Sequence, residues 1–252
     1  MKPTVLLLLF LLSEVAEADD GLLVAVASNF QTTARDIVSA FTLETGVPVR
    51  LSSGSTGKLY AQIVNGAPYD LFLAADMERP RRLMQDGLGI ESSLREYARG
   101  KLVLVSIDRA LSGQACLPAL HQGDWRRLAI ANPLTAPYGA AARSWLEAEG
   151  LWQDAESRIV MGENISQAFQ FVATGNATFG LIAASQLVSD RAGVDITCRD
   201  PVDLPNADSL RQGGIILYRS TKRREAQMFM EFLAGDEAGR LLTAAGYAQG
   251  NN

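Results

Sequence analysis

Short continuous apolar runs alternate along this chain with segments in which apolar residues recur every three or four positions. Leu22 to Ala27 is one such run, and it is typical of a buried strand. Phe30, Ala34, Ile37 and Phe41 follow it, and their spacing places them on one face of a helix. Because the same alternation continues toward the end of the chain, the pattern predicts an α/β fold.

The same reasoning predicts the other elements. Further strands are expected at residues 47–51, 70–74, 102–106, 128–131, 158–161, 179–183 and 214–218. The helix that contains Phe41 is expected to end near Gly46. Other helices are expected to include residues 59–63, 78–85, 140–149 and 165–173, and two amphipathic helices are expected from residue 222 onward. No repeat or low-complexity linker divides the sequence, so two domains would be joined by crossing strands and not by a flexible tether.

Four polar loops each connect the end of a predicted strand to the start of a predicted helix. They are Ala27-Ser28-Asn29, Gly54-Ser55-Thr56-Gly57, Ala136-Pro137-Tyr138-Gly139 and Gly162-Glu163-Asn164-Ile165. The first turn of a helix has unpaired backbone N–H groups and a partial positive charge, which together attract anions. In open α/β sheets, ligands bind at the carboxyl ends of the strands. The four loops therefore predict a site in which neutral donors hold a small anion.

Each loop taken alone also has a purely structural interpretation. Ser28 with Gln31 fits a helix-capping pattern, and so does Asn164 with Gln167. Gly57 is an ordinary turn residue. Only the occurrence of four such loops in one chain favours anion binding over capping.

The sequence argues against catalysis. Residues 52–59 approach a nucleotide-binding P-loop, but Ser52 and Leu59 occupy the positions that require glycine and a hydroxyl residue. There is no G-x-S-x-G motif, and the single histidine, His121, adjoins no nucleophile motif. Asp70 and Asp76 are interpreted as residues that shape turns around a strand. We therefore expect a protein that is not an enzyme and needs no cofactor.

The charge balance and the N-terminal residues indicate which classes of partner are disfavoured and whether the protein is exported. The formal net charge is −5 and no basic run is present, which argues against nucleic acid or an anionic membrane as partner. Lys2, the apolar run Val5 to Leu12 and the motif Ala16-Glu17-Ala18 fit a signal peptide cleaved near Ala18. A bilayer requires about 20 apolar residues, so this run is too short to span it. Residues 1–18 are predicted to be a signal peptide of an exported protein.

Two cysteines, Cys116 and Cys198, bear on the same question. In an exported protein a single pair favours one disulfide, although spacing alone leaves two separate buried thiols as an alternative. Neither cysteine follows the apolar run, so no lipid anchor is expected. With one histidine and no C-x-x-C motif, no resident metal site is expected.

The loops and their order resemble the periplasmic molybdate-binding proteins of ABC importers. The matching blocks are residues 26–29, 54–63, 66–76, 132–133 with 136–139, and 162–165, and the resemblance covers nearly the whole chain after residue 18. It implies a type II periplasmic binding protein fold, in which two lobes, each a mixed sheet flanked by helices, enclose the ligand in a hinge cleft. Lobe one would comprise residues 19–99 and 206–252, and lobe two residues 100–205.

The resemblance also implies a function and a set of ligand-binding residues. The protein would be a monomer in the periplasm that captures molybdate or tungstate, bound as the oxyanion, and delivers it to the permease and ATPase of an ABC importer. Carried over by position, Ser28 and Thr56 would donate hydroxyl groups, and Tyr138 and Ile165 their backbone N–H groups. Some members have a tyrosine ligand near position 183, where this chain has alanine, and Asn29 is expected to replace it.

Two other functions remain open from the residues. The anion could be sulfate, phosphate or a small organic acid, because charge and shape do not separate sulfate from molybdate. The same two-lobed molecule could also report its ligand to a receptor. The preference between molybdate and tungstate is likewise open.

Overall fold

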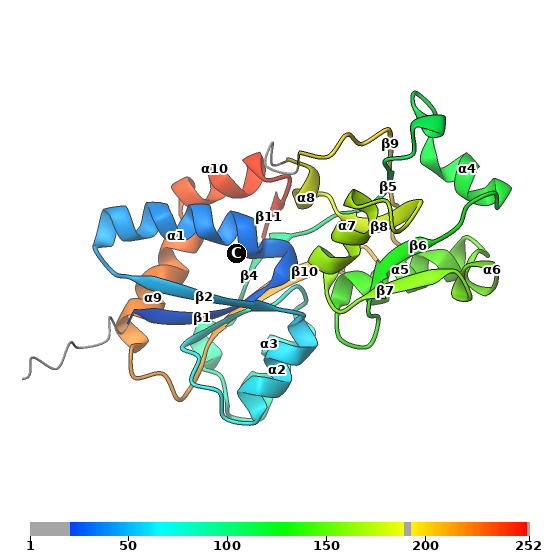
Figure 1. The fold of residues 1–252 in the computed structure, drawn as a ribbon. Coiled ribbons are helices and arrows are strands. Elements are labelled where there is room, and N and C mark those ends of the chain that lie inside the picture. The colour runs from blue at the N-terminus through cyan, green and yellow to red at the C-terminus, as the bar shows by residue number, and fades with distance from the viewer. Residues whose placement is uncertain (1–20, 189–192, 251–252) are drawn as a thin grey trace, which may run out of the picture.

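The computed structural model describes residues 21–188 and 193–250, which form two lobes, each built on one mixed β-sheet (Figure 1). The predicted signal peptide at residues 1–18 lies outside the described residues. The predicted α/β class and two-lobed architecture are confirmed.

The first sheet has six strands in the order β11-β4-β10-β3-β1-β2. They are β1 (Leu22–Ala27), β2 (Val49–Gly54), β3 (Leu71–Leu73), β4 (Arg95–Arg99), β10 (Arg211–Ile216) and β11 (Ala248–Gln249). β1 pairs in parallel with β2 and β3, whereas β10 runs antiparallel to β3 and β4. The carboxyl ends of β1, β2 and β3 therefore lie at one edge of the sheet.

Helices cover both faces of this sheet (Figure 1). They are α1 (Gln31–Thr45), α9 (Arg223–Leu233) and α10 (Asp236–Ala244) on one face, and α2 (Thr56–Val64) and α3 (Glu78–Gln85) on the other. Phe41 of α1 packs edge-on against Phe229 of α9, with ring centroids 5.0 Å apart. α1 ends at the predicted Gly46, whose left-handed backbone lets its N–H bond Thr42.

The second sheet has five strands in the order β7-β6-β8-β5-β9. They are β5 (Leu102–Ser106), β6 (Leu128–Ala131), β7 (Ile159–Gly162), β8 (Phe179–Ala183) and β9 (Cys198–Pro201). α4 (Cys116–Gln122), α5 (Pro137–Ala148) and α6 (Trp152–Glu156) pack on one face, and α7 (Ile165–Ala173) and α8 (Ser185–Val188) lie on the other. The short 3-10 helices are η1 (Ser28–Phe30), η2 (Glu91–Ser93) and η3 (Arg109–Leu111).

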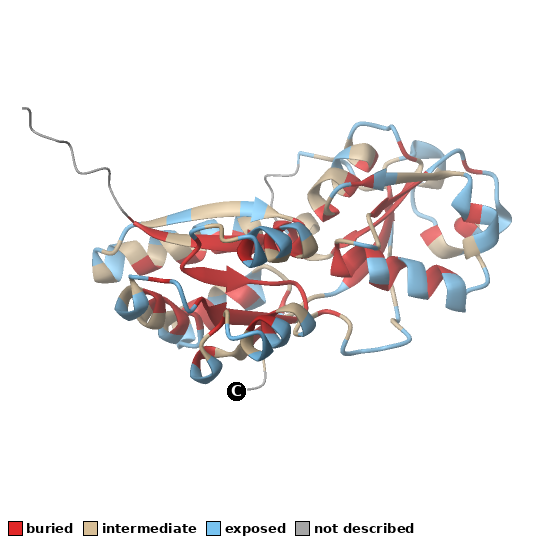
Figure 2. Ribbon diagram, turned by 90° about the horizontal axis from the view of Figure 1, so that it is seen from below, coloured by how far each residue is buried: buried red, intermediate tan, exposed pale blue. Residues whose placement is uncertain are grey.

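Buried residues concentrate in the strands of both lobes, while the outer helix surfaces are exposed (Figure 2). Each lobe has its own hydrophobic clusters, so each contains a separate core. Ala27 is the last residue of β1, and Ala75 follows β3 by two residues. Both pack against the main hydrophobic cluster of the second lobe. The carboxyl edge of the first sheet therefore contacts the second lobe directly.

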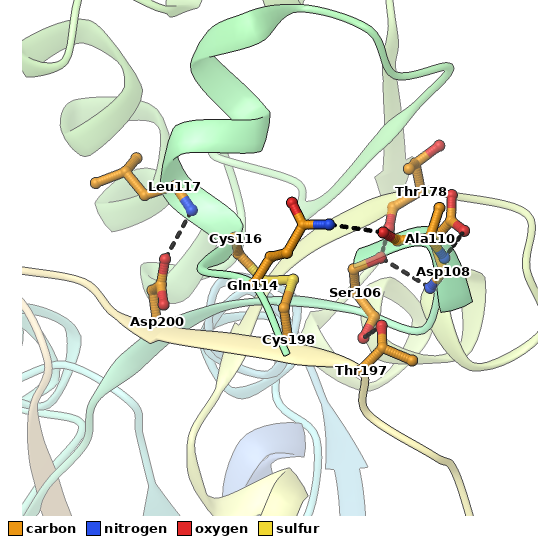
Figure 3. The surroundings of a disulfide bond; sticks show 10 residues. All are labelled: Ser106, Asp108, Ala110, Gln114, Cys116, Leu117, Thr178, Thr197, Cys198 and Asp200. Carbon is orange, nitrogen blue, oxygen red and sulfur yellow. Dashed lines mark hydrogen bonds between the residues drawn. A yellow bond between two sulfur atoms is a disulfide. The ribbon is translucent and has the colours of Figure 1, made fainter. Parts of the chain in front are cut away.

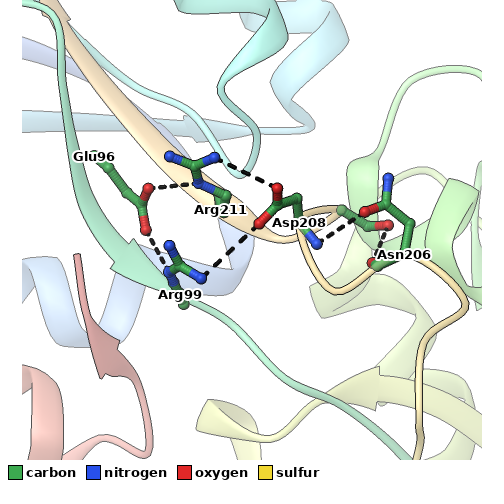
Figure 4. A network of polar contacts seen from close by, with 6 residues as sticks. Glu96, Arg99, Asn206, Asp208 and Arg211 are labelled. Carbon is green, nitrogen blue, oxygen red and sulfur yellow. Dashed lines mark hydrogen bonds and ion pairs between the residues drawn. The ribbon is translucent and has the colours of Figure 1, made fainter. Parts of the chain in front are cut away.

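The chain passes between the sheets twice, from β4 to β5 and from β9 to β10. A polar network lies where these segments meet the first sheet (Figure 4). The buried Glu96 carboxylate accepts hydrogen bonds from Nε of Arg99, at 2.6 Å, and from Nε of Arg211. Asp208 lies 3.5 Å from Arg211 and 3.9 Å from Arg99. These ion pairs connect the two crossing segments where they join β4 and β10, which are neighbouring strands of the first sheet.

The predicted pairing of Cys116 with Cys198 is confirmed, with Cα atoms 5.4 Å apart (Figure 3). The bond joins the start of α4 to the start of β9. The Leu117 N–H donates to the Asp200 carboxylate at 2.7 Å, which adds a second link between the same two elements. The alternative of two separate thiols is thereby excluded.

The predicted strands correspond to β1, β2, β3, β5, β6, β7, β8 and β10, with some ends displaced by up to a few residues. The pattern missed β4, β9, β11, α4, α6 and α8. β4 was missed because its sequence, Arg-Glu-Tyr-Ala-Arg, is too polar for a typical buried strand. Its charges are satisfied by Arg211 and Asp208, which lie far away in the sequence. No helix among the described residues is long and apolar enough to cross a bilayer.

Candidate functional site

A small cavity lies between the lobes, where the carboxyl edges of the two sheets face each other. All five residues predicted to bind the anion line it: Ser28, Asn29, Thr56, Tyr138 and Ile165. The rest of its lining consists of Ala27, Gly54, Ser55, Ala75, Ala136 and Pro137. No charged side chain belongs to this lining. The loops that were predicted to converge do so, although their role in binding an anion stays a prediction.

The first lobe contributes the segment after β1 and the start of α2. Ser28 and Asn29 form the first turn of η1, and neither η1 nor α1 has a side-chain cap, so the capping interpretation of Ser28 is wrong. The Thr56 hydroxyl oxygen accepts a hydrogen bond from the Ala75 N–H at 3.1 Å. Because a hydroxyl can accept and donate at once, the Thr56 proton remains available for a ligand.

The second lobe contributes the starts of α5 and α7. Pro137 is the first residue of α5 and has no N–H, so Tyr138 supplies the first backbone donor of that helix. Asn164 caps α7, and its side chain accepts from the Gln167 N–H at 3.1 Å, which confirms the predicted cap. Ile165 then occupies the first helical position. Both helices therefore begin at the cavity, with the positive ends of their dipoles toward it.

One glycine is needed for this arrangement of α5. A Cβ atom on Gly139 would lie 2.3 Å from the Ala131 carbonyl oxygen, so only glycine allows the start of α5 to lie this close to β6.

The two lobes touch on both sides of the cavity. On one side the Gly57 N–H donates to the Thr135 carbonyl at 2.8 Å, and Lys58 forms an ion pair with Glu163. On the other side Ser166 and Ser185 donate to the carbonyl groups of Ser28 and Asn29, at 3.2 and 3.3 Å. These contacts correspond to a closed arrangement of the lobes.

Asp70 and Asp76 lie outside the cavity lining, as the structural interpretation predicted. The Asp70 carboxylate accepts from the Leu23 N–H and from the Ser220 hydroxyl, at 2.8 and 2.7 Å. Asp76 binds Arg79, and burial raises the pKa of its carboxyl group against the opposing effect of that guanidinium. Both residues therefore hold turns together, and neither places a carboxylate in the cavity wall.

The family model of the bacterial extracellular solute-binding proteins matches residues 22–248. The molybdate-binding protein ModA of Azotobacter vinelandii is 40% identical over 227 residues, which span 89% of this chain and 88% of that protein. The ModA protein of Rhodobacter capsulatus is 37% identical, with 88% and 86% covered.

A solved structure agrees with the sequence comparison. The periplasmic molybdate-binding protein of Azotobacter vinelandii superimposes with a TM-score of 0.82 at 36% identity, and the match covers 90% of this chain and 98% of that one. The chain belongs to the periplasmic molybdate-binding family of bacterial extracellular solute-binding proteins. Its type II binding-protein fold follows from the same match.

The side-chain amide hydrogens of Asn29 are engaged within the protein, and the expected replacement of the tyrosine ligand by Asn29 stays a prediction. The side-chain nitrogen of Asn29 donates both hydrogens, to the Gln212 oxygen at 3.0 Å and to the Tyr247 hydroxyl at 3.1 Å. The backbone N–H of Asn29, in the first turn of η1, is the group that remains for an anion.

A buried polar network behind Asn29 was not predicted from the sequence. Gln212 accepts from the Tyr97 hydroxyl at 2.9 Å and donates to the Tyr138 hydroxyl at 3.5 Å, while Tyr247 donates to the Asn29 carbonyl at 2.8 Å. Burial raises the pKa of Tyr97 and Tyr138 well above 10 and that of Tyr247 to about 12, so all three phenols stay neutral. The network links Asn29 of one lobe to Tyr138 of the other.

Ser55 was also missed as a lining residue. It belongs to the same Gly-Ser-Thr-Gly segment as Thr56, so its position was visible in the sequence, but the resemblance assigned only Thr56. Tyr97, Gln212 and Tyr247 had no such signal, because each lies far in sequence from the loops they support.

Proposed function

We propose that this protein captures molybdate in the periplasm and delivers it to the permease and ATPase of an ABC importer, with tungstate as a second ligand. The observation that carries the proposal is the cavity between the lobes, which all five predicted residues line without any charged side chain. The curated relatives named as molybdate-binding proteins support the choice of anion. The cavity needs no cofactor for this role, and it contains no nucleophile paired with a base.

Neutral donors are sufficient to hold a dianion. A divalent oxyanion buried without partners would cost tens of kcal/mol, so every oxygen needs donors. Each hydrogen bond to a charged group contributes roughly 1.5–3 kcal/mol. Micromolar affinity requires about −8 kcal/mol, so about five to seven such bonds are enough once the cost of association is subtracted.

We propose that the donors are the hydroxyl and N–H groups of Ser28, the N–H of Asn29, the hydroxyl of Thr56 and the N–H groups of Tyr138 and Ile165. With lobe one at residues 19–99 and 206–252 and lobe two at residues 100–205, donors come from both lobes. Closure around the anion therefore completes its shell, and the ligand stabilises the closed form because only that form offers all contacts.

The donor set also bears on which anions are excluded. A monoprotonated phosphate has an O–H that needs an acceptor, and the cavity lining contains no carboxylate to provide one. Sulfate is fully ionised like molybdate, so it can be rejected only by size. A sensory role for the same fold is the remaining alternative, and molybdate uptake by the reconstituted importer with and without this protein separates the two.

Titration of the purified protein with molybdate, tungstate, sulfate and phosphate tests the ligand, read by calorimetry and tryptophan fluorescence. We expect submicromolar binding of molybdate and tungstate, with sulfate at least about tenfold weaker because a smaller anion cannot reach all donors at once. Equal affinity for molybdate and sulfate would contradict the proposed selectivity. An absence of molybdate binding would overturn the function itself.

A further inference from the structure

The hydroxyl group of Ser55 is buried beside the cavity and has no hydrogen-bond partner among the described residues. Ser55 is 3% exposed and lines the cavity together with Thr56. A buried hydroxyl without a partner costs roughly 1–3 kcal/mol, and such groups are rare in folded proteins. The position of this hydroxyl therefore requires an explanation.

Helix capping does not provide that explanation. Ser55 is the N-cap residue of α2, and serine at this position normally accepts a hydrogen bond from an N–H in the first turn. Its backbone is extended, with φ −69° and ψ 143°, which suits capping, yet its side chain makes no such bond. Ser55 does contribute its carbonyl, which accepts from the Leu59 N–H at 3.0 Å. Capping therefore does not account for the buried hydroxyl.

We propose that the Ser55 hydroxyl donates a hydrogen bond to the bound oxyanion, next to the hydroxyl of Thr56. This inference rests on the proposed function and adds a donor that the resemblance does not assign. When the lobes separate, water reaches the hydroxyl; when they close, the anion takes the place of that water as its partner. Thr56 already accepts from Ala75, so the start of α2 offers two adjacent hydroxyl donors, each with its proton free.

Ser55→Ala tests the proposal through two quantities, the dissociation constant for molybdate and the Tm of the ligand-free protein, of which only the first should change. We expect the dissociation constant for sodium molybdate to rise about ten- to hundredfold, because a hydrogen bond to a charged acceptor is lost. The Tm of the ligand-free protein should not fall, because no cap is removed. A structural role would give the opposite result, with a lower Tm and an unchanged dissociation constant. Ser55→Gly removes the same hydroxyl and keeps a residue that N-cap positions tolerate, so it should reproduce the affinity loss.

Thr135→Val is a matched control. The Thr135 hydroxyl is likewise buried with no hydrogen-bond partner within residues 21–188 and 193–250, but Thr135 is not part of the cavity lining. Its carbonyl, which receives the Gly57 N–H across the lobes, is kept in the variant. We expect its affinity for molybdate to stay within about twofold of the wild type.

The outcomes are distinct. A wild type that binds molybdate, together with Ser55→Ala of unchanged affinity, would overturn this inference alone. An equal loss in Ser55→Ala and Thr135→Val would also overturn it, because any buried hydroxyl at the lobe boundary would then matter. If the wild type does not bind molybdate, the proposed function fails and the inference fails with it.

Discussion

Single hydroxyl and amide groups, placed at helix starts, set the chemistry of this cavity. Ser28 makes no cap, Thr56 accepts from Ala75 and keeps its proton, and Asn29 has committed both amide hydrogens to Gln212 and Tyr247. Each of these residues therefore has a hydrogen-bond donor available, and none carries a charge. A charged side chain would attract a dianion of any shape. The selectivity proposed for the site depends on where these donors lie.

Ser28→Ala should weaken molybdate binding by roughly 1–3 kcal/mol, because one oxygen of the anion loses a hydroxyl donor inside a closed cavity. Calorimetric titration measures the change, and the Tm of the ligand-free protein shows that the fold is intact. Ser39→Ala on the solvent-facing side of α1 is a suitable control, since its hydroxyl bonds only the Arg35 carbonyl. An unchanged dissociation constant would remove Ser28 from the shell.

The three buried tyrosines predict an alkaline loss of stability. Their folded pKa values lie above 10, and that of Tyr247 is about 12, whereas the unfolded chain ionises near 10. Unfolding therefore releases protons above pH 10, so this stabilisation is complete below pH 10 and is lost as pH rises through the folded values. The ultraviolet absorbance of tyrosinate should show fewer ionised tyrosines in the folded protein than in urea between pH 10 and about 12. Coincident titration of both states would contradict the buried network.

At the scale of elements, the cavity residues are positioned mainly by the N-terminal turns of α2, α5 and α7 and by close contacts of the backbone at these turns. α5 begins with proline and packs closely on β6 through Gly139, and α7 is capped by Asn164. α2 approaches the opposite lobe through Gly57, whose N–H bonds the Thr135 carbonyl. Where the lobes meet, the backbone itself forms the contact.

Gly57→Ala should impair closure while leaving each lobe folded. A Cβ atom at this position would lie 2.9 Å from the Thr135 carbonyl oxygen and 3.0 Å from its Cα, so the lobes could not reach their present distance. Alanine favours a helix over glycine by about 1 kcal/mol, so the ligand-free protein should be no less stable. We expect weaker molybdate binding and a smaller ligand-induced compaction in small-angle X-ray scattering. Wild-type affinity in this variant would mean that the Gly57–Thr135 contact is not needed for binding.

At the scale of the whole molecule, two cores meet along a polar boundary that contains the cavity. The lobes are connected by two crossing segments, which Glu96, Arg99 and Arg211 hold together at the first sheet. The disulfide lies in the second lobe and joins residues 82 positions apart. It therefore stiffens one lobe without joining it to the other, which leaves opening and closing free.

Replacement of Cys116 and Cys198 by serine should destabilise the second lobe and leave the ligand shell intact. A disulfide typically contributes about 2–4 kcal/mol, mainly by restricting the unfolded chain. Thermal unfolding should show the lower Tm, while molybdate titration at a temperature well below it should give a nearly unchanged dissociation constant. Mass spectrometry of the unreduced wild type after alkylation should detect no free thiol. Two alkylated cysteines would contradict the pairing.

The sequence by itself determined the α/β class, most of the strands, and the four loops at helix starts that converge on the cavity, while the resemblance assigned the five binding residues within those loops. These features depend on neighbours within a few positions, such as apolar periodicity, a proline at a helix start or a glycine at a helix end. The resemblance added the two-lobed arrangement, because the order of the motifs carries more information than any one of them.

Tertiary structure alone decided the rest. It places Gln212 and Tyr247, which lie 183 and 218 positions away, against Asn29, where both accept hydrogen bonds from the Asn29 amide. It also forms β4 from a polar segment by supplying Arg211 for Glu96, and pairs the two cysteines. It leaves the Ser55 hydroxyl buried beside the cavity with no hydrogen-bond partner in the part of the chain that the structure describes. Whether a polar group is satisfied depends on residues brought near by folding, and local sequence contains no record of them.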